Sequence, residues 1–465
     1  MTTIAKKTTG KGVSPIIVLL GILLLATALT YLVESGSYQR DGKLVVPGTY
    51  QTLEKSRSPL QLLDVGQDAE AGGAQPVGLV DTLLAIPQGL KRMADLIFMV
   101  LIIGGMFGVM THTGAIDAGL ERLLSGMRGN VYILVPALMI VYSAGSTFLG
   151  LASEYLLIIP LMVAMAHRLG LSNLVGLAIV TVAVKVGYLS SVSNPIPLSI
   201  AQPLVGLQIF SGAGFRFLSY LVFLVVGIVF VLLMIRREGH DSALDREFDA
   251  RRLSPRHLLV LWVVAVGIAL LVYGSNRWHW THHDLSAYYV AMSIVIAISG
   301  GLGASEAADA FVSGMKKVLM ASMLIGVASA VAVVLEQGQV LDSIVHTLTQ
   351  LIGENGPWPA AIGMFGAQLF LDFLIPSTSG QAAVSMPIMG PLGQLSGVGP
   401  QTTVLAFLFG NGITNLLTPT SGTLLAYLAT AQVSWIDWAR AVFWLWVAFI
   451  AVAIALLSIA VLIGY

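Results

Sequence analysis

The chain contains a series of apolar stretches that approach or exceed about 18 residues, the length at which a helix crosses the hydrocarbon core of a bilayer. They lie near residues 14–33, 94–111, 173–189, 217–235, 256–273, 286–303, 318–335, 400–417 and 440–464. Apolar residues make up 56% of the chain and charged residues only 10%, against about a quarter in a typical soluble domain. We therefore expect an all-α polytopic membrane protein with about nine transmembrane helices.

Charge and cysteine content exclude several other classes of protein. The formal net charge is zero and the sequence has no long basic run, so we expect no nucleic-acid partner. Cysteine is absent, which removes disulfides, thiolate metal sites and cysteine nucleophiles. Lys6, Lys7 and Lys11 precede the first apolar stretch as in a signal peptide, but that stretch is long and has no convincing cleavage site. We interpret it as a retained helix.

The sequence repeats itself weakly with an offset near 225 residues. "GLKR" at 89–92 matches "GMKK" at 314–317, Pro160 matches Pro387, and Arg216 matches Arg440 in the same order. Internal repeats of this length are typical of secondary transporters. They predict a first repeat over residues 1–235, a linker over 236–257 and a second repeat over 258–465.

The basic segments predict the orientation of the repeats. The lysines of the N-terminus and the arginine-rich linker should both be cytoplasmic, so the crossings between them should be even in number. Residues 131–166 should then form an inner re-entrant hairpin with "YSAGST" (142–147) at its bend. The unmatched helix 286–303 would invert the second repeat, whose hairpin 358–396 should enter from outside with "PSTSG" (376–380) at its bend. This places the C-terminus outside; eleven simple crossings are the alternative.

Less apolar segments complete the predicted architecture. Residues 34–82 should form an extracytoplasmic loop with a pair of strands around Asp41 and Gly42. Segments 83–92 and 306–317 are amphipathic with basic ends, which favours helices that lie along the membrane interface.

Four polar segments interrupt the apolar sequence: the two predicted bends, "SSVSNP" (190–195) and "NGITNLLTPTSG" (411–422). Irregular backbone at membrane depth persists only where protein or a wet cavity surrounds it. We expect the four segments to meet near the midplane and bind substrate. Half-helices that start there would direct N–H groups at a carboxylate, and carbonyl and Asn oxygens near Asn194 and Asn415 could hold Na⁺. Small polar residues that merely permit close helix packing are the alternative.

The candidate residues fall into two sets. The polar segments supply candidate substrate contacts, which include Gly145, Ser193, Asn194, Gly380, Asn411, Asn415 and Thr420. Charged residues inside membrane helices are expensive and usually functional, so Glu154, Lys185 and Asp372 are candidates for ion coupling. Lys185 could neutralise Glu154 or Asp372, attract a carboxylate or replace a bound cation; a purely structural ion pair is the alternative.

No enzyme motif of the HExxH, Walker A or GxSxG type is present, so we expect no catalytic residues and no cofactor other than Na⁺. We expect a secondary active transporter for a small carboxylate-bearing metabolite, such as an amino acid or a C4-dicarboxylate, coupled to H⁺ or Na⁺ or working by exchange. An ion or solute channel is the first alternative. An intramembrane hydrolase would require a second acid beside Asp372.

The chain resembles the YfcC and DcuC-type carriers of the ion-transporter superfamily. The resemblance is carried by "FGVMTHTGAIDAGLERL" (107–123), "GSTFLGLASEYLLIIPL" (145–161), "SSVSNPIPLSIAQPL" (190–204), "IPSTSGQAAVSMPIMGPL" (375–392) and "LAFLFGNGITNLLTPTSGTL" (405–424). It implies an inverted-repeat fold, a homodimer formed by scaffold domains, elevator movement of a transport domain, and a location in the bacterial inner membrane. It would place substrate against Ser146, Thr147, Asn194, Ser377, Thr378, Ser379, Asn415, Thr418 and Ser421. Relatives tend to have two acids after the first bend, where this chain has only Glu154.

Overall fold

The computed structural model describes residues 15–42, 44–55, 73–116, 118–119, 122, 130–238, 254–278, 280–353 and 356–465. The described chain is mostly helical. Its helices are α1 (Pro15–Leu32), α2 (Leu79–Arg92), α3 (Ala94–His112), α5 (Val131–Leu149), α6 (Ile158–Arg168), α7 (Asn173–Ser190), α8 (Pro195–Leu204), α9 (Ala213–Arg237), α10 (Pro255–Arg277), α11 (His282–Gly300), α12 (Ala304–Gln337), α13 (Leu341–Ile352), α14 (Pro357–Leu374), α15 (Thr378–Leu395), α16 (Pro400–Thr414), α17 (Gly422–Ala431) and α18 (Trp435–Leu462), with a 3₁₀ turn, η2, over Ser153–Leu156. The basic N-terminal lysines and most of the predicted linker lie outside the described residues.

Six of the described helical segments are long and apolar enough to cross a membrane: Ala94–His112, Val131–Leu149, Asn173–Leu204, Ala213–Arg237, Ala304–Gln337 and Trp435–Leu462. The apolar helices Ile16–Leu32, Pro255–Leu271 and Gly422–Ala431 are shorter. These helices support a multi-pass membrane protein, and the expected nine crossings stay a prediction. The candidate spans differ in their surroundings, because 94% of the α7–α8 window is buried in protein but only 33% of the α18 window is.

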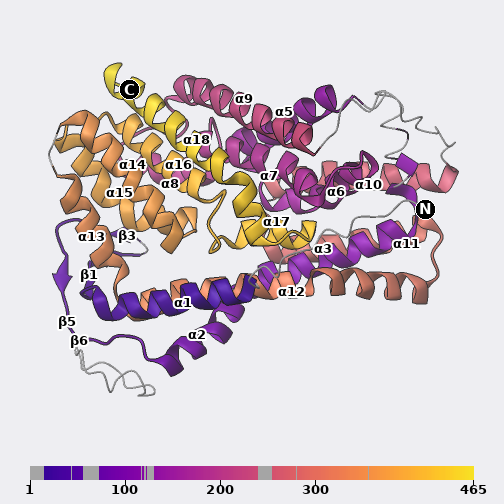
Figure 1. Cartoon of the computed structure of the whole chain (residues 1–465), viewed down its shortest axis with the longest axis horizontal. Coiled ribbons are helices and arrows are strands. Elements are labelled where there is room, and N and C mark those ends of the chain that lie inside the picture. The colour runs from indigo at the N-terminus through magenta and orange to yellow at the C-terminus, as the bar shows by residue number, and fades with distance from the viewer. Residues whose placement is uncertain are drawn as a thin grey trace.

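The helices pack as two groups (Figure 1). In the first group, α1, α2 and α3 pack on the long helix α12, α11 packs on α3, and α10 packs on α11. In the second group, α5, α6, α9 and α16 surround α7, while α14, α15 and α18 pack on α16. Helix α17 joins the groups because it contacts α12 and α3 as well as α6 and α7.

The interface helix predicted for 306–317 is not a separate element. Helix α12 runs without a break from Ala304 to Gln337, so this segment and the predicted span 318–335 form one rod about 50 Å long. Helix α12 contains no proline that would interrupt it. Gly314 lies where α12 crosses α3, since a Cβ at Gly314 would be 2.2 Å from the Gly104 carbonyl oxygen. The other predicted interface segment, 83–92, lies in α2.

The order of elements in the second group repeats along the chain. The first set is α5, a turn with η2, α6, α7, a break, α8 and α9, and the second set is α14, a turn, α15, α16, a break, α17 and α18. The sets lie about 225 residues apart, as the sequence repeat predicts. The opposed membrane orientation of the two sets stays a prediction.

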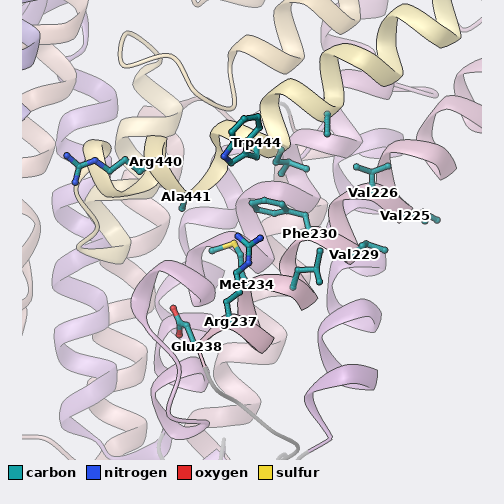
Figure 2. A pocket seen from close by; sticks show the side chains of 13 residues that line it. Val225, Val226, Val229, Phe230, Met234, Arg237, Glu238, Arg440, Ala441 and Trp444 are labelled. Atoms are coloured by element: carbon teal, nitrogen blue, oxygen red, sulfur yellow. The ribbon is translucent and has the colours of Figure 1, made fainter.

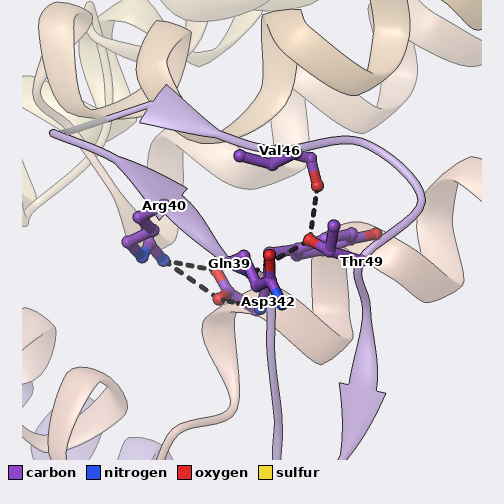
Figure 3. A network of polar contacts seen from close by, with 6 residues as sticks. Gln39, Arg40, Val46, Thr49 and Asp342 are labelled. Carbon is purple, nitrogen blue, oxygen red and sulfur yellow. Dashed lines mark hydrogen bonds and ion pairs between the residues drawn. The ribbon is translucent and has the colours of Figure 1, made fainter.

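Between α1 and α2 the described residues include six short strands: β1 (Gly36–Ser37), β2 (Arg40–Asp41), β3 (Leu44–Val45), β4 (Gln51–Thr52), β5 (Glu54–Lys55) and β6 (Gly73–Ala74). The pairing of β2 with β3 confirms the strand pair predicted around Asp41 and Gly42. We call residues 33–42 and 44–55 the strap, because they pass from α1 across the start of α13. Figure 3 shows part of this contact, in which Arg40 Nη2 donates to both oxygens of Asp342, at 2.7 and 3.0 Å.

Aromatic side chains of the strap hold the same helix. The Tyr50 ring stacks on His346 at a centroid distance of 3.9 Å, and the Tyr38 hydroxyl lies 3.0 Å from His346 Nδ1. Burial, with Asp342 nearby, raises the pKa of Tyr38 to about 12, so its hydroxyl stays neutral at physiological pH. The strap therefore ties α13, which precedes the second hairpin, to α1.

Candidate functional site

The first predicted bend lies a few residues later than the sequence suggested. "YSAGST" forms the last turns of α5, and the chain turns instead at Gly150, which has the left-handed φ of 74° and ends the helix. The bend is displaced because small residues at 143–146 remain compatible with a helix that packs closely on α7. A Cβ at Gly187 of α7 would lie only 2.4 Å from the Ser143 carbonyl oxygen.

The end of α5 is bonded to the break between α7 and α8. The Ser146 hydroxyl donates to the Val184 carbonyl at 2.9 Å, and the Val192 N–H donates to the Thr147 hydroxyl at 3.0 Å. Asn194 joins both sides, because its Nδ2 donates to the Ser146 carbonyl at 3.2 Å while its Oδ1 accepts from the Ile196 N–H at 3.0 Å. Asn194 thereby caps the N-terminus of α8.

Two further candidates of the first half have local partners. Ser193 donates its N–H to the Thr147 carbonyl at 3.1 Å and its hydroxyl to the Phe148 carbonyl at 3.3 Å. Gly145 leaves room for the Tyr155 hydroxyl, which a Cβ would meet at 2.2 Å. Close packing between the bend and η2 therefore requires glycine at this position.

A fully buried arginine, Arg216 of α9, supports the same break. Its guanidinium donates to the Ser191 and Val192 carbonyls, each at 3.1 Å, which are buried where α7 ends. It also donates to the Ser211 carbonyl at 2.7 Å and the Gln401 Oε1 at 3.3 Å. No described carboxylate forms an ion pair with it. Arg216 therefore brings an unpaired positive charge close to the break.

The second half gathers its polar groups around Asp372, which is fully buried in α14. Its Oδ1 accepts from Asn411 Nδ2 at 2.7 Å and from Asn415 Nδ2 at 3.3 Å. Its Oδ2 is buried and has no hydrogen-bond partner among the described residues. A buried carboxylate oxygen without a donor is costly, and a proton or a cation bound at this atom would remove that cost.

Lys185 of α7 completes the cluster from the first half of the chain. Its Nζ donates to Asn415 Oδ1 at 2.6 Å, and the Asn415 amide donates in turn to Asp372 and to the Pro376 carbonyl at 3.2 Å. Lys185 and Asp372 are thus bridged by one asparagine instead of forming a direct ion pair. Of the two acids that the sequence offered as partners, the structure places Asp372 in this cluster.

The sequence offered Glu154 as a second partner for Lys185, but the hydrogen bond of its carboxylate is made outside the Asp372 cluster. Its carboxylate accepts from the Ala152 N–H at 2.8 Å, within its own turn. The Ala152 carbonyl accepts from the hydroxyl of Tyr427 on α17, which ties the first bend to the second repeat. Glu154 therefore bonds within its own turn, and its predicted role in ion coupling stays a prediction.

The remaining candidates lie around the second bend and break. Thr378 contacts the Tyr188 hydroxyl and lies 3.4 Å from Asn411 Oδ1. The Ser421 hydroxyl donates to Asn415 Oδ1 at 2.9 Å, and Thr420, which contacts Thr418, donates to the Phe373 carbonyl at 2.9 Å.

The bend at 376–380 begins helix α15. Ser377 caps it by accepting from the Gly380 N–H at 3.3 Å, and Ser379 lies 3.4 Å from the same hydroxyl. Ser377 and Ser379 are exposed, whereas Asp372 and Asn411 are buried. Ser377 and Ser379 of the bend therefore lie at the protein surface, whereas the cluster around Asp372 is buried.

Sequence reasoning missed three polar side chains of this cluster. Tyr188 donates to Asn411 Oδ1 at 2.7 Å, and Gln381 accepts from Asn411 Nδ2 at 2.8 Å while donating to Gln368 Oε1 at 2.7 Å. The signals were present, because Tyr188 lies three residues after Lys185 on one helix face and Gln381 directly follows the bend.

Three helix N-termini begin at the breaks: α8, α15 and α17, capped by Asn194, Ser377 and Ser421. Each supplies the positive end of a helix dipole, and α15 and α17 also supply free N–H groups. The first turn of α8 supplies none, because Pro195 and Pro197 have no N–H and the Ile196 N–H is bonded to Asn194.

The N-termini of α15 and α17 lie beside the buried amides around Asp372, because Asn415 donates to the Pro376 carbonyl and accepts from Ser421, whereas the Asn194 side chain bonds within the first half of the chain. Among the described residues no three His, Asp or Glu side chains gather as a metal-binding group.

Comparison with known proteins gives consistent family matches. A family model for the C4-dicarboxylate anaerobic carrier, DcuC, matches residues 14–462. YfcC of Escherichia coli (strain K12), provisionally named a basic amino acid antiporter, is 27% identical over 467 residues, which cover 91% of each chain. An uncharacterized protein of Haemophilus influenzae is 26% identical over 479 residues, which cover 94% of each chain.

Two solved transporters resemble the chain more distantly. The Alcanivorax borkumensis YdaH transporter is 14% identical with a TM-score of 0.44, covering 97% of this chain and 99% of its own. The antimetabolite efflux pump MtrF of Neisseria gonorrhoeae is 16% identical with a TM-score of 0.43, covering 96% and 95%. Scores at this level support no detailed comparison of the sites.

Proposed function

The chain belongs to the C4-dicarboxylate anaerobic carrier (DcuC) family of transporters, and from this premise we propose that it is a secondary active carrier of elevator type for a small carboxylate-bearing metabolite. The observation that carries the proposal is the set of polar helix ends and amides around Asp372 in the interior of a bundle of membrane-spanning length. Such groups are retained in a membrane protein where they serve a substrate or an ion.

A carboxylate is the chemical group that the site suits best. The N-termini of α15 and α17 offer N–H donors and positive dipole ends, and α8 adds a third dipole end. Hydroxyls such as Thr378 and Ser421 add short donors. The named relatives agree on this one group, since a C4-dicarboxylate and a basic amino acid each carry a carboxylate. An amino acid or a C4-dicarboxylate is therefore the substrate class we propose.

Asp372 and Lys185 are the groups we propose for coupling. Asp372 Oδ2 lacks a described donor, while the side-chain amides of Asn411 and Asn415 donate to Oδ1, so Oδ2 is the oxygen that we propose binds H⁺ or Na⁺. Lys185 supplies the balancing charge through Asn415. Na⁺ symport, H⁺ coupling and exchange are all compatible with this arrangement, and Asn194 offers a second oxygen at the first break.

The two helix groups suggest how the site could reach both sides of the membrane. The breaks belong to the group around α7 and α16, while α1, α2, α3, α11 and α12 form the other group. We propose that the group around α7 and α16 moves as a transport domain against the group around α12 as a scaffold, in a homodimer in the bacterial inner membrane. The N-terminus would be cytoplasmic and the C-terminus outside.

The test has two stages. First, the thermal unfolding of purified protein is measured with amino acids and C4-dicarboxylates, with and without Na⁺, because a ligand that binds the folded state raises its stability. Second, uptake of the stabilising compound into proteoliposomes is measured for Asn194→Ala and Asn415→Ala, with Asn173→Ala as a matched control. Asn173 bonds the Ala431 carbonyl at the opposite end of α7.

We expect both site variants to fold and to lose uptake, and the control to retain it. Full uptake in both site variants would refute the site. A substrate-dependent single-channel current in a planar bilayer would refute the carrier mechanism and favour a channel.

A further inference from the structure

A groove of about 600 Å³ lies between α9 and α18, and its lining changes in character at one end (Figure 2). Most of its lining is apolar, from Val225 to Met234 on α9 and from Ala441 to Ala448 on α18. Arg237 and Arg440 line the other end. We propose that this groove binds an anionic phospholipid, with an acyl chain along the apolar part and the phosphate at the two arginines.

Both arginines lie toward one end of the packed helix pair α9 and α18. Helix α9 ends at Arg237 and α18 begins at Trp435, so the end of one helix meets the beginning of the other. The apolar stretch from Val225 to Met234 is about 14 Å long at 1.5 Å per residue, which accommodates much of an acyl chain. In Figure 2 the Arg237 guanidinium reaches toward Met234 and Phe230, whereas Arg440 lies at the rim with its side chain extended away from the groove, so Arg440 would have to turn inward to reach a phosphate bound at Arg237.

The charges at the polar end suit a phosphate. Within the described chain no carboxylate forms an ion pair with Arg237 or Arg440. Glu238 also lines the groove, but its two oxygens accept from the hydroxyl and the N–H of Ser172, at 2.6 and 3.0 Å. Because Glu238 is held at the N-terminus of α7, the two guanidinium groups remain available to a phosphate diester.

The surroundings of the groove favour a lipid over a second copy of the chain. The α9 and α18 windows are the least buried of the candidate spans, at 39% and 33%, and Trp444 in the groove is 70% exposed. A symmetric contact between two copies through this surface would bring the arginines of both copies together. Basic pockets between membrane helices are typical sites for anionic headgroups.

The experiment uses Trp444 as a reporter. The full-length protein is placed in nanodiscs of phosphatidylcholine with increasing fractions of brominated phosphatidylglycerol or, separately, brominated phosphatidylcholine, whose bromines quench tryptophan fluorescence on contact. The Trp444 signal is the difference between the protein and Trp444→Phe. The test variant is Arg237→Gln with Arg440→Gln, and the matched control is Arg236→Gln, since Arg236 is exposed on α9 but does not line the groove.

We expect the phosphatidylglycerol fraction that half-quenches Trp444 to rise about fivefold for each arginine removed and roughly 25-fold for both, with the Arg236→Gln control unchanged. High salt should weaken the preference for phosphatidylglycerol in the unmodified protein, which tests the proposal without any arginine variant. Equal quenching by both lipids, or no effect of the double variant, would overturn the proposal. Absence of quenching together with cross-linking of two chains at this face would assign it to a second copy.

Discussion

The two broken helices meet the same backbone problem with different chemistry. At the end of α7 the Ser191 and Val192 carbonyls accept from one charged side chain, Arg216. About 225 residues later, the equivalent Leu416 and Leu417 carbonyls accept from the neutral indoles of Trp438 and Trp435, at 2.9 and 2.8 Å. The comparison shows that the geometry of a break can be kept while its charge is changed.

The two hairpins also differ in charge, but here the charged group is in the second half of the chain and the neutral group is in the first. Near the end of α5, Thr147 offers a hydroxyl that accepts from Val192 N–H. At the equivalent position of α14, Asp372 offers a carboxylate that accepts from Asn411 and Asn415. The first half therefore contributes the buried cations, Arg216 and Lys185, and the second contributes the buried anion. A substrate between the halves would experience a field directed from one repeat to the other.

The largest expected effect is the loss of Arg216. Arg216→Gln leaves the Ser191 and Val192 carbonyls without their donor, at about 1–3 kcal/mol for each buried acceptor, so we expect a loss of about 2–6 kcal/mol. The measurement is unfolding in detergent by heat or denaturant. Arg216→Lys, which keeps the charge and at least one donor, should lose less. Equal stability of Arg216→Gln and the unmodified protein would contradict the role of Arg216 at this break.

The division of charges between the halves predicts a coupled pair. Lys185→Met or Asp372→Leu alone leaves one buried charge uncompensated, which we expect to destabilise the protein by about 3–5 kcal/mol. The double variant should recover much of this loss while transport stays abolished. The measurement is a double-mutant cycle on unfolding together with uptake. Additive losses would show that the Asn415 bridge transmits no coupling.

Removing a donor at the second break should reduce the stability of the protein less than removing Arg216 at the first. Trp438→Phe removes one donor, to the Leu416 carbonyl, so we expect a loss of about 1–3 kcal/mol. Trp444→Phe is the matched control, because this side chain is 70% exposed and should contribute little. A loss from Trp438→Phe as large as that from Arg216→Gln would remove the distinction between a charged and a neutral support.

The sequence located most of the helix breaks but not the contacts around them. Three of the four breaks lie where Pro, Gly and Asn predicted them. These residues disfavour a continuous helix through their own backbone preferences, which do not depend on tertiary contacts. The first bend was displaced because Ser143 and Gly145 are tolerated in a helix, and the decisive residue was Gly150. The partners of Lys185 and Arg216 could not be predicted, because tertiary packing selects them from several groups in reach, and Arg216 had served only as a marker of the repeat.

The smallest expected effect concerns the strap, which contacts the second hairpin through β3 and α15 and also holds α13. Arg40 is 41% exposed on its side chain, so its ion pair with Asp342 should contribute only about 0.2–1 kcal/mol. We expect Arg40→Gln to raise amide hydrogen exchange in α13 and α15 by at most about fivefold and to leave α5 and α6 unchanged. Asp41→Asn, a neighbouring exposed charge, is the matched control. Faster exchange in both hairpins would mean that the strap stabilises the whole bundle, and the two hairpins would then differ in sequence but not in how they are held.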